Sequence, residues 1–234
     1  MRRATLGIVG GIAPGSTIDY YRLLVDRYRE RVPDGSYPSI VINSIDLTSL
    51  LEMAASGDRE RLVEYMLTAI AVLDRAGAAV ALMASNTPHL VFDEVARRSP
   101  IPLVSIVEAT AAEAVARGLK KIGLIGTRFT MDGGFYPAVC ARYGVTVVVP
   151  QPDDRTWVHD RYFAELVGGN FRQETRDGMT AVMRRMQERD GIDGVILGGT
   201  ELPLLFRGAS LSDLPMLDTT RIHVEAALDR LLAL

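Results

Sequence analysis

The sequence predicts an α/β protein made of two similar lobes, each a mainly parallel sheet with helices on both faces, in three αβα layers. Three observations support this prediction. Apolar strand-like runs alternate with amphipathic helical stretches along the chain. Several runs are unbroken, which is typical of parallel strands covered on both faces. The second half of the chain also repeats the first. We expect residues 1–98 with 209–234 to form one lobe and residues 99–208 the other.

The chain opens with a predicted strand over residues 5–10, a turn at Gly10-Gly11 and a helix that runs to about Arg31. Ser16 or Thr17 is the expected N-cap of this helix. A glycine-rich turn before a helix can bring backbone amides close to an anion. The glycine spacing matches neither the dinucleotide fingerprint nor a Walker loop, so a plain strand-to-helix turn is an equally good interpretation.

Further strands are expected over residues 38–43, 78–84 and 100–106, with helices over 58–77 and 107–117. The run at 78–84 is apolar throughout, which favours a central strand. It stops on Ser85, Asn86 and Thr87. Ligands of open α/β sheets bind outside the carboxyl ends of the strands, so these small polar side chains are candidates for a binding site.

An internal repeat organises the chain. LGIVG at residues 6–10 is echoed by IGLIG at 122–126, VALMASNTP by GVILGGTELP, and IPLVS at 101–105 by LPMLD at 214–218, with offsets between about 113 and 116 residues. Two such halves related by a pseudo-two-fold axis bring equivalent strand ends together. We therefore expect Ser85 to face Gly199 across a cleft between the lobes, which is the predicted site.

The composition argues against several classes of function. The chain has 234 residues and a net charge of −3, with charges spread along it, so it offers no basic field for nucleic acid. Its apolar runs are strand-length and no secretory apolar core follows the N-terminus, so we expect a cytoplasmic protein without a membrane span. One cysteine, Cys140, excludes an internal disulfide, and the three histidines never share an i, i+4 spacing, which gives a metal site little support.

The motifs together resemble the aspartate/glutamate racemase family, whose members work without pyridoxal phosphate. The resemblance covers essentially the whole chain. It is carried by GGIAPGST with Tyr20-Tyr21, Asn43-Ser44, SNTPH at 85–89, GTRFTMDGGFY at 126–136, the segment 154–169, GGTELP at 198–203 and LDTTRIH at 217–223. It implies a cofactor-independent enzyme and a homodimer, which is also the commonest oligomer in general.

The resemblance also locates two catalytic positions. In the family each of the two facing motifs usually carries a cysteine, and one thiolate removes the Cα proton while the opposite thiol returns one. Here Ser85 occupies the first cysteine position and Gly199 the second. Cys140 lies well along a predicted helix, away from both strand ends, and is interpreted as a buried structural thiol. Two-thiol racemisation of aspartate or glutamate is therefore not expected.

What remains is a cradle for a carboxylate or an amino acid. By resemblance it comprises Gly11, Ser16, Asn86, Thr87, Thr127 and Thr200, with Glu201 and His223 nearby as catalytic candidates beside Ser85 and Gly199. Each has a structural alternative. Asn86 and Thr87 could be helix N-caps, Glu201 could complement a helix N-terminus, and His223 could be a buried histidine satisfied by a neighbour.

Three hypotheses about function follow. The first is a racemase-like isomerase of altered chemistry, with Ser85 or a bound water in the first position and Glu201 or His223 relaying protons. The second is a catalytically silent protein that binds the same kind of ligand. The third is a decarboxylase, lyase or cyclase on the same scaffold. A distal-carboxylate lysine usual in the family aligns with Gly168, so the substrate cannot be named from the sequence. We also expect Ser85→Cys with Gly199→Cys to restore some Cα exchange.

Overall fold

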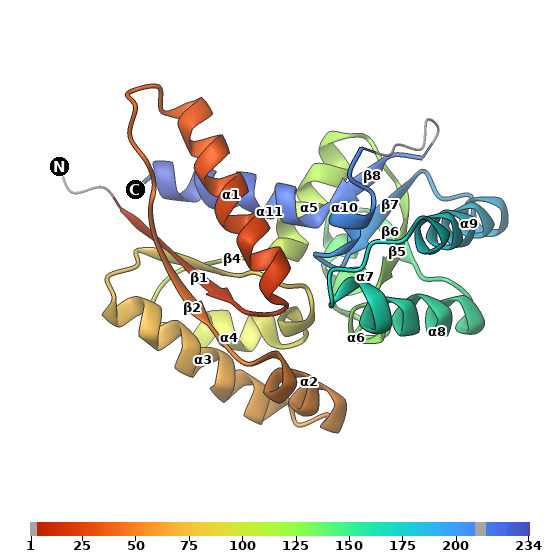
Figure 1. Ribbon diagram of the computed structural model, residues 1–234, viewed down its shortest axis with the longest axis horizontal. Coiled ribbons are helices and arrows are strands. Elements are labelled where there is room, and N and C mark those ends of the chain that lie inside the picture. The colour runs from red at the N-terminus through yellow and green to blue at the C-terminus, as the bar shows by residue number, and fades with distance from the viewer. Residues whose placement is uncertain (1–3, 209–213) are drawn as a thin grey trace. The chain divides into compact units, whose positions relative to one another are not determined.

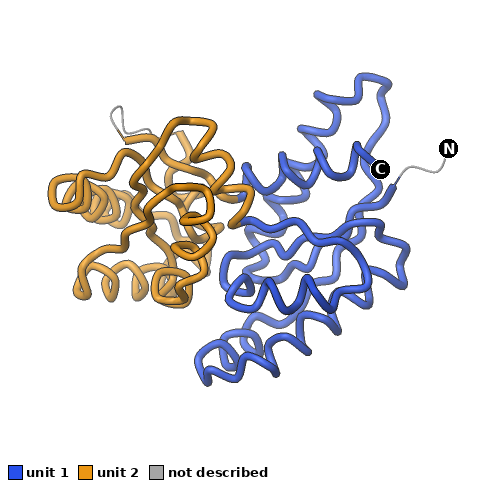
Figure 2. Tube along the Cα trace, turned by 180° about the vertical axis from the view of Figure 1, so that it is seen from behind, with its two compact units in different colours: residues 1–106, 220–234 blue, residues 107–219 orange. Residues whose placement is uncertain are grey.

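The computed structural model describes residues 4–208 and 214–234. The chain divides into two compact units, residues 1–106 with 220–234 and residues 107–219 (Figure 2). Each unit contains its own four-stranded parallel sheet. The predicted α/β class with two parallel sheets is thereby confirmed.

The sheet of unit 1 has the strand order β2-β1-β3-β4. Its strands are β1 (Thr5–Gly10), β2 (Ser39–Ser44), β3 (Val80–Met83) and β4 (Leu103–Val104). β1 and β3 lie side by side and in parallel, with Val9 opposite Met83. The carboxyl ends of these two central strands therefore share one edge of the sheet.

Helices cover both faces of this sheet (Figure 1). Leu6 and Ile8 of β1 pack with α1 (Pro14–Arg31) and α11 (Thr219–Leu232), whereas Val9 packs on the other face with α2 (Leu47–Ser56), α3 (Arg59–Arg75) and α4 (Phe92–Arg98). Successive side chains of a strand point to opposite faces, so this apolar strand supplies both layers of the core. A short 3₁₀ helix at Thr87–Val91 links β3 to α4.

Unit 2 repeats the same topology. Its sheet has the order β6-β5-β7-β8, formed by β5 (Lys121–Gly126), β6 (Thr146–Val148), β7 (Gly194–Gly198) and β8 (Met216–Asp218). The helices are α5 (Ile106–Ala116), α6 (Arg128–Met131), α7 (Phe135–Arg142), α8 (Pro152–Arg161), α9 (Gln173–Asp190) and α10 (Leu202–Leu205). A π-helical turn at Tyr162–Leu166 continues directly from α8. The equivalent strand orders are what the internal sequence repeat predicts.

The structure differs from the sequence expectations at three points. β4 spans 103–104 rather than 100–106. The units divide near residues 106 and 219 rather than 98 and 208, because β4 pairs with β3 in unit 1 and β8 pairs with β7 in unit 2; residues 209–213, where the second expected boundary falls, lie outside the described residues. α1 begins at Pro14, so Ser16 and Thr17 are not its N-cap.

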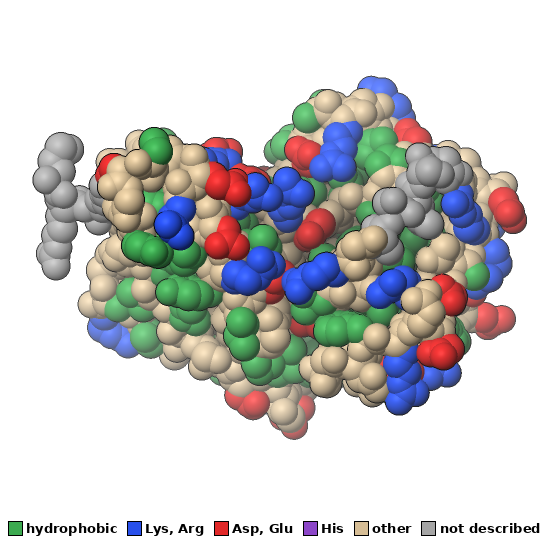
Figure 3. Space-filling view, turned by 45° about the horizontal axis from the view of Figure 1, so that its top comes forward, with side chains coloured by type: hydrophobic (Ala, Val, Ile, Leu, Met, Phe, Trp, Pro, Cys, Tyr) green, Lys and Arg blue, Asp and Glu red, His purple; other side chains and the backbone are tan. Residues whose placement is uncertain are grey.

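The surface carries both signs of charge. On the face drawn in Figure 3, Lys and Arg side chains occur together with Asp and Glu side chains. Ion pairs such as Arg98 with Glu60 and Arg185 with Asp154 join charges of opposite sign within each unit. Within residues 4–208 and 214–234, no helix is both long and apolar enough to span a membrane. The same residues contain no cluster of three His, Cys, Asp or Glu suited to a metal ion.

Candidate functional site

In unit 1 the predicted site residues gather at the carboxyl ends of β1 and β3. The amide of Ala84 donates to the carbonyl of Val9 at 2.9 Å, so the chain after β3 stays beside the chain after β1. Gly11 has a φ of +87°, and a Cβ there would lie 2.3 Å from the carbonyl oxygen of Ile45. Its N–H donates to Thr17 Oγ1 at 2.9 Å. The turn therefore uses this amide internally, which favours a plain strand-to-helix turn over an anion-binding role for the Gly11 amide.

The polar residues after β3 are buried. Ser85, Asn86 and Thr87 expose only 7%, 2% and 6% of their surfaces. Asn86 precedes the 3₁₀ helix without a capping hydrogen bond from its side chain, and its carbonyl accepts from the amide of His89 at 3.0 Å. Ser16 is also buried, and its hydroxyl donates to the carbonyl of Ala13 at 2.8 Å. These side chains are the candidate site residues that unit 1 contributes.

Beneath Ser85 lie two buried histidines. Nδ1 of His89 donates to the carbonyl of Ser85 at 3.0 Å, and its Nε2 accepts from the amide of Ile106 at 3.1 Å. Nε2 of His223 donates to the carbonyl of Val104 at 2.9 Å, and its Nδ1 accepts from Tyr20 at 2.9 Å. Those partners fix one neutral tautomer for each ring.

Burial lowers the pKa of His89 to about 3, with a further contribution from the nearby His223, and lowers the pKa of His223 to about 4. His223 is fully buried, and both of its ring nitrogens have protein partners. This geometry matches the structural alternative for His223. Neither nitrogen is left over to exchange a proton with a ligand.

In unit 2 the remaining predicted residues follow β5 and β7. Gly126 pairs with Gly198 at the ends of these neighbouring strands, so Thr127 and Gly199 both emerge at one edge of the sheet. Thr127 caps α6, because its hydroxyl accepts from the amide of Thr130 at 3.3 Å. Thr200 and Glu201 are buried, and the Thr200 hydroxyl donates to Glu201 Oε2 at 3.1 Å. The candidate residues of unit 2 are thus also rich in hydroxyl groups.

The sequence analysis missed Tyr162, which lies against Gly199. A Cβ built on Gly199 would meet Cε2, Oη and Cζ of Tyr162 at 2.4, 2.5 and 2.7 Å, far inside van der Waals contact. The Tyr162 hydroxyl donates to Glu201 Oε2. Tyr162 lies in the segment 154–169, but nothing in a single sequence links it to a glycine 37 positions later. Only the packing of the π-helical turn against the end of β7 reveals the pair.

This contact corrects one expectation. A cysteine at residue 199 needs the volume that Tyr162 already fills. Ser85→Cys with Gly199→Cys is therefore not expected to restore exchange unless Tyr162 is also replaced. The chain's own thiol does not substitute, because Cys140 is fully buried in α7 and burial raises its pKa to about 11.

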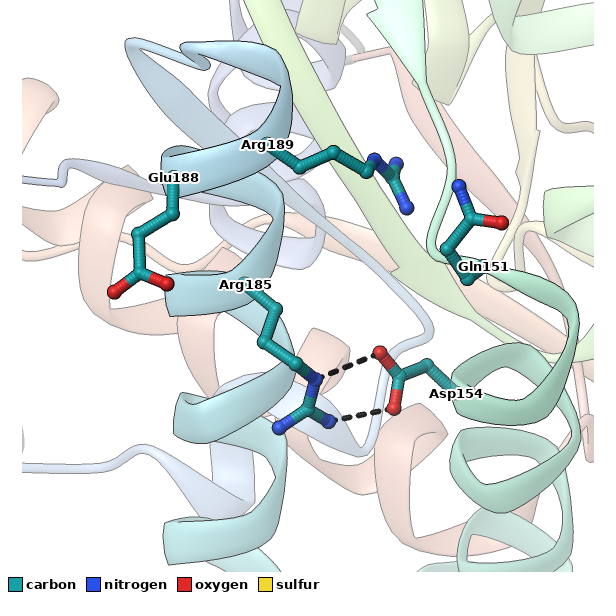
Figure 4. A pocket seen from close by; sticks show the side chains of 5 residues that line it. All are labelled: Gln151, Asp154, Arg185, Glu188 and Arg189. Atoms are coloured by element: carbon teal, nitrogen blue, oxygen red, sulfur yellow. Dashed lines mark hydrogen bonds and ion pairs between the residues drawn. The ribbon is translucent and has the colours of Figure 1, made fainter.

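An open surface pocket of about 380 Å³ lies between the start of α8 and the last turns of α9 (Figure 4). It is lined by Gln151, Asp154, Arg185, Glu188 and Arg189. Arg185 forms a bidentate ion pair with Asp154, with Nε to Oδ2 at 2.9 Å, and Arg189 donates to the carbonyl of Val149 at 3.0 Å. None of the predicted site residues lines this pocket, and its two guanidinium groups already have protein partners.

Comparison with known proteins agrees with the fold and the motifs. Residues 9–227 match the family model described as Asp/Glu/hydantoin racemase. A provisionally assigned Asp/Glu racemase from Yersinia pestis is 34% identical, with 98% of this chain and 99% of that chain covered and a TM-score of 0.85. An aspartate racemase homologue from Pyrococcus horikoshii OT3 is also 34% identical, with 99% and 100% covered and a TM-score of 0.80.

A curated relative is more distant. The broad specificity amino-acid racemase RacX of Bacillus subtilis is 21% identical over 232 residues, which covers 97% of this chain and 98% of that protein. The family model spans nearly the whole chain, and the two solved structures cover 98% and 99% of it. The chain therefore belongs to the Asp/Glu/hydantoin racemase family.

Proposed function

We propose that this protein binds a small carboxylate or amino acid at the polar strand ends that carry Ser85 and Gly199. We further propose that it acts there as a racemase-like isomerase whose chemistry does not use a pair of thiols. The observation that carries the second part is the cysteine content. Residues 85 and 199 are serine and glycine, and the one cysteine is buried in α7 with a raised pKa.

The ligand class is supported by the groups that end the central strands. Asn86 and Thr87 in unit 1, and Thr127 and Thr200 in unit 2, offer amide and hydroxyl groups at the edge where parallel sheets bind ligands. Such groups suit a carboxylate without an arginine. The family membership and the broad-specificity relative point to an amino acid as the carboxylate.

In this proposal the Ser85 hydroxyl, or a water bound beside it, takes the first position, and Glu201 relays protons on the other side. A serine without an adjacent base is a weak proton acceptor. We therefore expect L-aspartate and L-glutamate to exchange their Cα hydrogen on the order of 100-fold more slowly than with a two-cysteine member of the family. The measurement is proton NMR of each amino acid in deuterated water with both proteins side by side.

The proposal as a whole is tested by a panel of L- and D-amino acids and small dicarboxylates. Thermal shift identifies those that bind, since a ligand of the native state raises the unfolding midpoint. We expect at least one binder to exchange its Cα hydrogen, and Ser85→Ala to abolish that exchange. Ser99→Ala is the matched control, because Ser99 hydrogen-bonds to Ile101 in the same unit, at the end of α4.

Binding without exchange would favour the second hypothesis, a catalytically silent protein that binds the same kind of ligand. The serine and glycine at the two family positions, and the tyrosine that fills the space beside the glycine, are also what a catalytically silent binding protein could carry. A compound that raises the unfolding midpoint strongly, yet is neither exchanged nor converted, would establish a binding protein instead of an isomerase.

A further inference from the structure

The phenol of Tyr162 occupies the volume that a side chain at residue 199 would need. The three distances from a Cβ at Gly199 to Tyr162 are 2.4 to 2.7 Å, and one of them is to the hydroxyl oxygen. Tyr162 exposes only 4% of its surface, so its position is set by packing rather than by solvent. It begins a π-helical turn, a feature that is frequent at functional sites. A proton-bearing group therefore lies beside a residue that has no side chain of its own.

The surroundings of this hydroxyl hold its proton in place. Glu201 Oε2 accepts the phenolic hydrogen bond and also accepts from Thr200. The amide of Glu201 points its N–H at the phenolic oxygen, 3.4 Å away. Burial, followed by the negative charge of Glu201, raises the pKa of Tyr162 well above its ordinary value. The phenol stays protonated at neutral pH, which suits a donor of a proton rather than an acceptor.

We propose that Tyr162 is the proton donor on the Gly199 side of the ligand and that Glu201 is its positioning residue. This inference rests on the proposed function, with Tyr162 in place of Glu201 as the group that transfers the proton. The Oη–H bond of Tyr162 breaks, and its proton joins the electron pair of the substrate carbanion to form the new Cα–H bond. The O–H electron pair stays on Oη, which the Glu201 amide stabilises. The phenolate regains a proton from solvent before the next turnover, and the proton removed from the opposite face leaves on the Ser85 side.

The test uses the amino acid that the wild-type protein exchanges most rapidly in the panel. Tyr162→Phe removes only the hydroxyl, and we expect kcat for deuterium incorporation and racemisation to fall by about 10²- to 10⁴-fold, with KM changed by no more than about threefold. Tyr136→Phe is the matched control. Tyr136 is likewise a fully buried tyrosine of unit 2, its hydroxyl bonds to Thr110, and we expect its loss to leave kcat unchanged.

The test of Glu201 must distinguish a role in positioning Tyr162 from an effect on folding. Glu201→Ala is expected to lower kcat with KM retained, and Glu201→Gln to restore most of it, because the amide oxygen can still accept the phenolic hydrogen bond. Circular dichroism and the unfolding midpoint of each variant establish that it is folded.

The outcomes separate the two claims. If the wild-type protein exchanges an amino acid and Tyr162→Phe does so at the same kcat, the proposed function stands and the donor role of Tyr162 is wrong. If the wild-type protein exchanges none of the panel, the isomerase function fails, and the donor role fails with it. A loss confined to Tyr162→Phe, with Tyr136→Phe unaffected, supports both.

Discussion

Acid should destabilise this protein through two histidines. His89 and His223 are fully buried and neutral in the folded state, with pKa values of about 3 and about 4. In the unfolded chain both return to about 6.5. As the pH falls below 6.5 the unfolded chain therefore binds more protons than the folded one, and the free energy of unfolding decreases. The stabilisation is complete above pH 6.5 and is lost as the pH falls toward the folded values.

The magnitude follows from the two shifts. Each histidine contributes up to about 1.4 kcal/mol per pH unit within this window. Between pH 7 and pH 5 the two histidines together lower the free energy of unfolding by about 4 kcal/mol. This is a large part of the roughly 5–15 kcal/mol by which folded proteins are typically stable. His89 resists protonation more strongly, because a proton on Nε2 would face the N–H of Ile106, whereas a proton on Nδ1 of His223 would face a hydroxyl that can rotate.

Urea unfolding followed by far-ultraviolet circular dichroism at pH 7, 6 and 5 measures this loss. The measurement is made in a His159→Gln background, since burial also lowers the pKa of the half-buried His159. His223→Gln, whose amide can still donate to the carbonyl of Val104, should halve the decrease to about 2 kcal/mol. A free energy of unfolding that stays level between pH 7 and pH 5, or a decrease that His223→Gln leaves intact, would refute this reasoning.

Two further predictions concern packing. Gly199→Ala should lower the free energy of unfolding by about 1–3 kcal/mol, because its Cβ overlaps Tyr162. Thermal unfolding should show that this loss largely disappears in a Tyr162→Ala background. Full additivity of the two changes would contradict the overlap. Cys140 should not react with iodoacetamide at pH 8 in the folded protein and should react fully in urea, since burial raises its pKa to about 11; rapid labelling of the native protein would show that the thiol is accessible.

Much of the fold could be predicted from local patterns. The unbroken run at Val80–Met83 and its repeat at Gly194–Gly198 are central strands, as expected of apolar segments with both faces covered. The N-cap of α1 differs from the prediction because Ser16 and Thr17 resemble N-caps in sequence. In the structure the Thr17 hydroxyl instead accepts a hydrogen bond from the amide of Gly11. The unit boundaries differed for a similar reason: strand pairing is a non-local property, which alone decides the sheet that β4 and β8 join.

The candidate site, like the fold, was predictable from the sequence only in part. The sequence by itself determined the strand ends, the absence of cysteine at residues 85 and 199, and the hydroxyl-rich residues around them, because each is a matter of residue type following an apolar run. Only the tertiary structure decided that both nitrogens of His223 have partners and that Tyr162 fills the space beside Gly199. The physical reason is that these contacts join residues far apart in the chain, and close packing of side chains from different elements is not encoded in any local spacing.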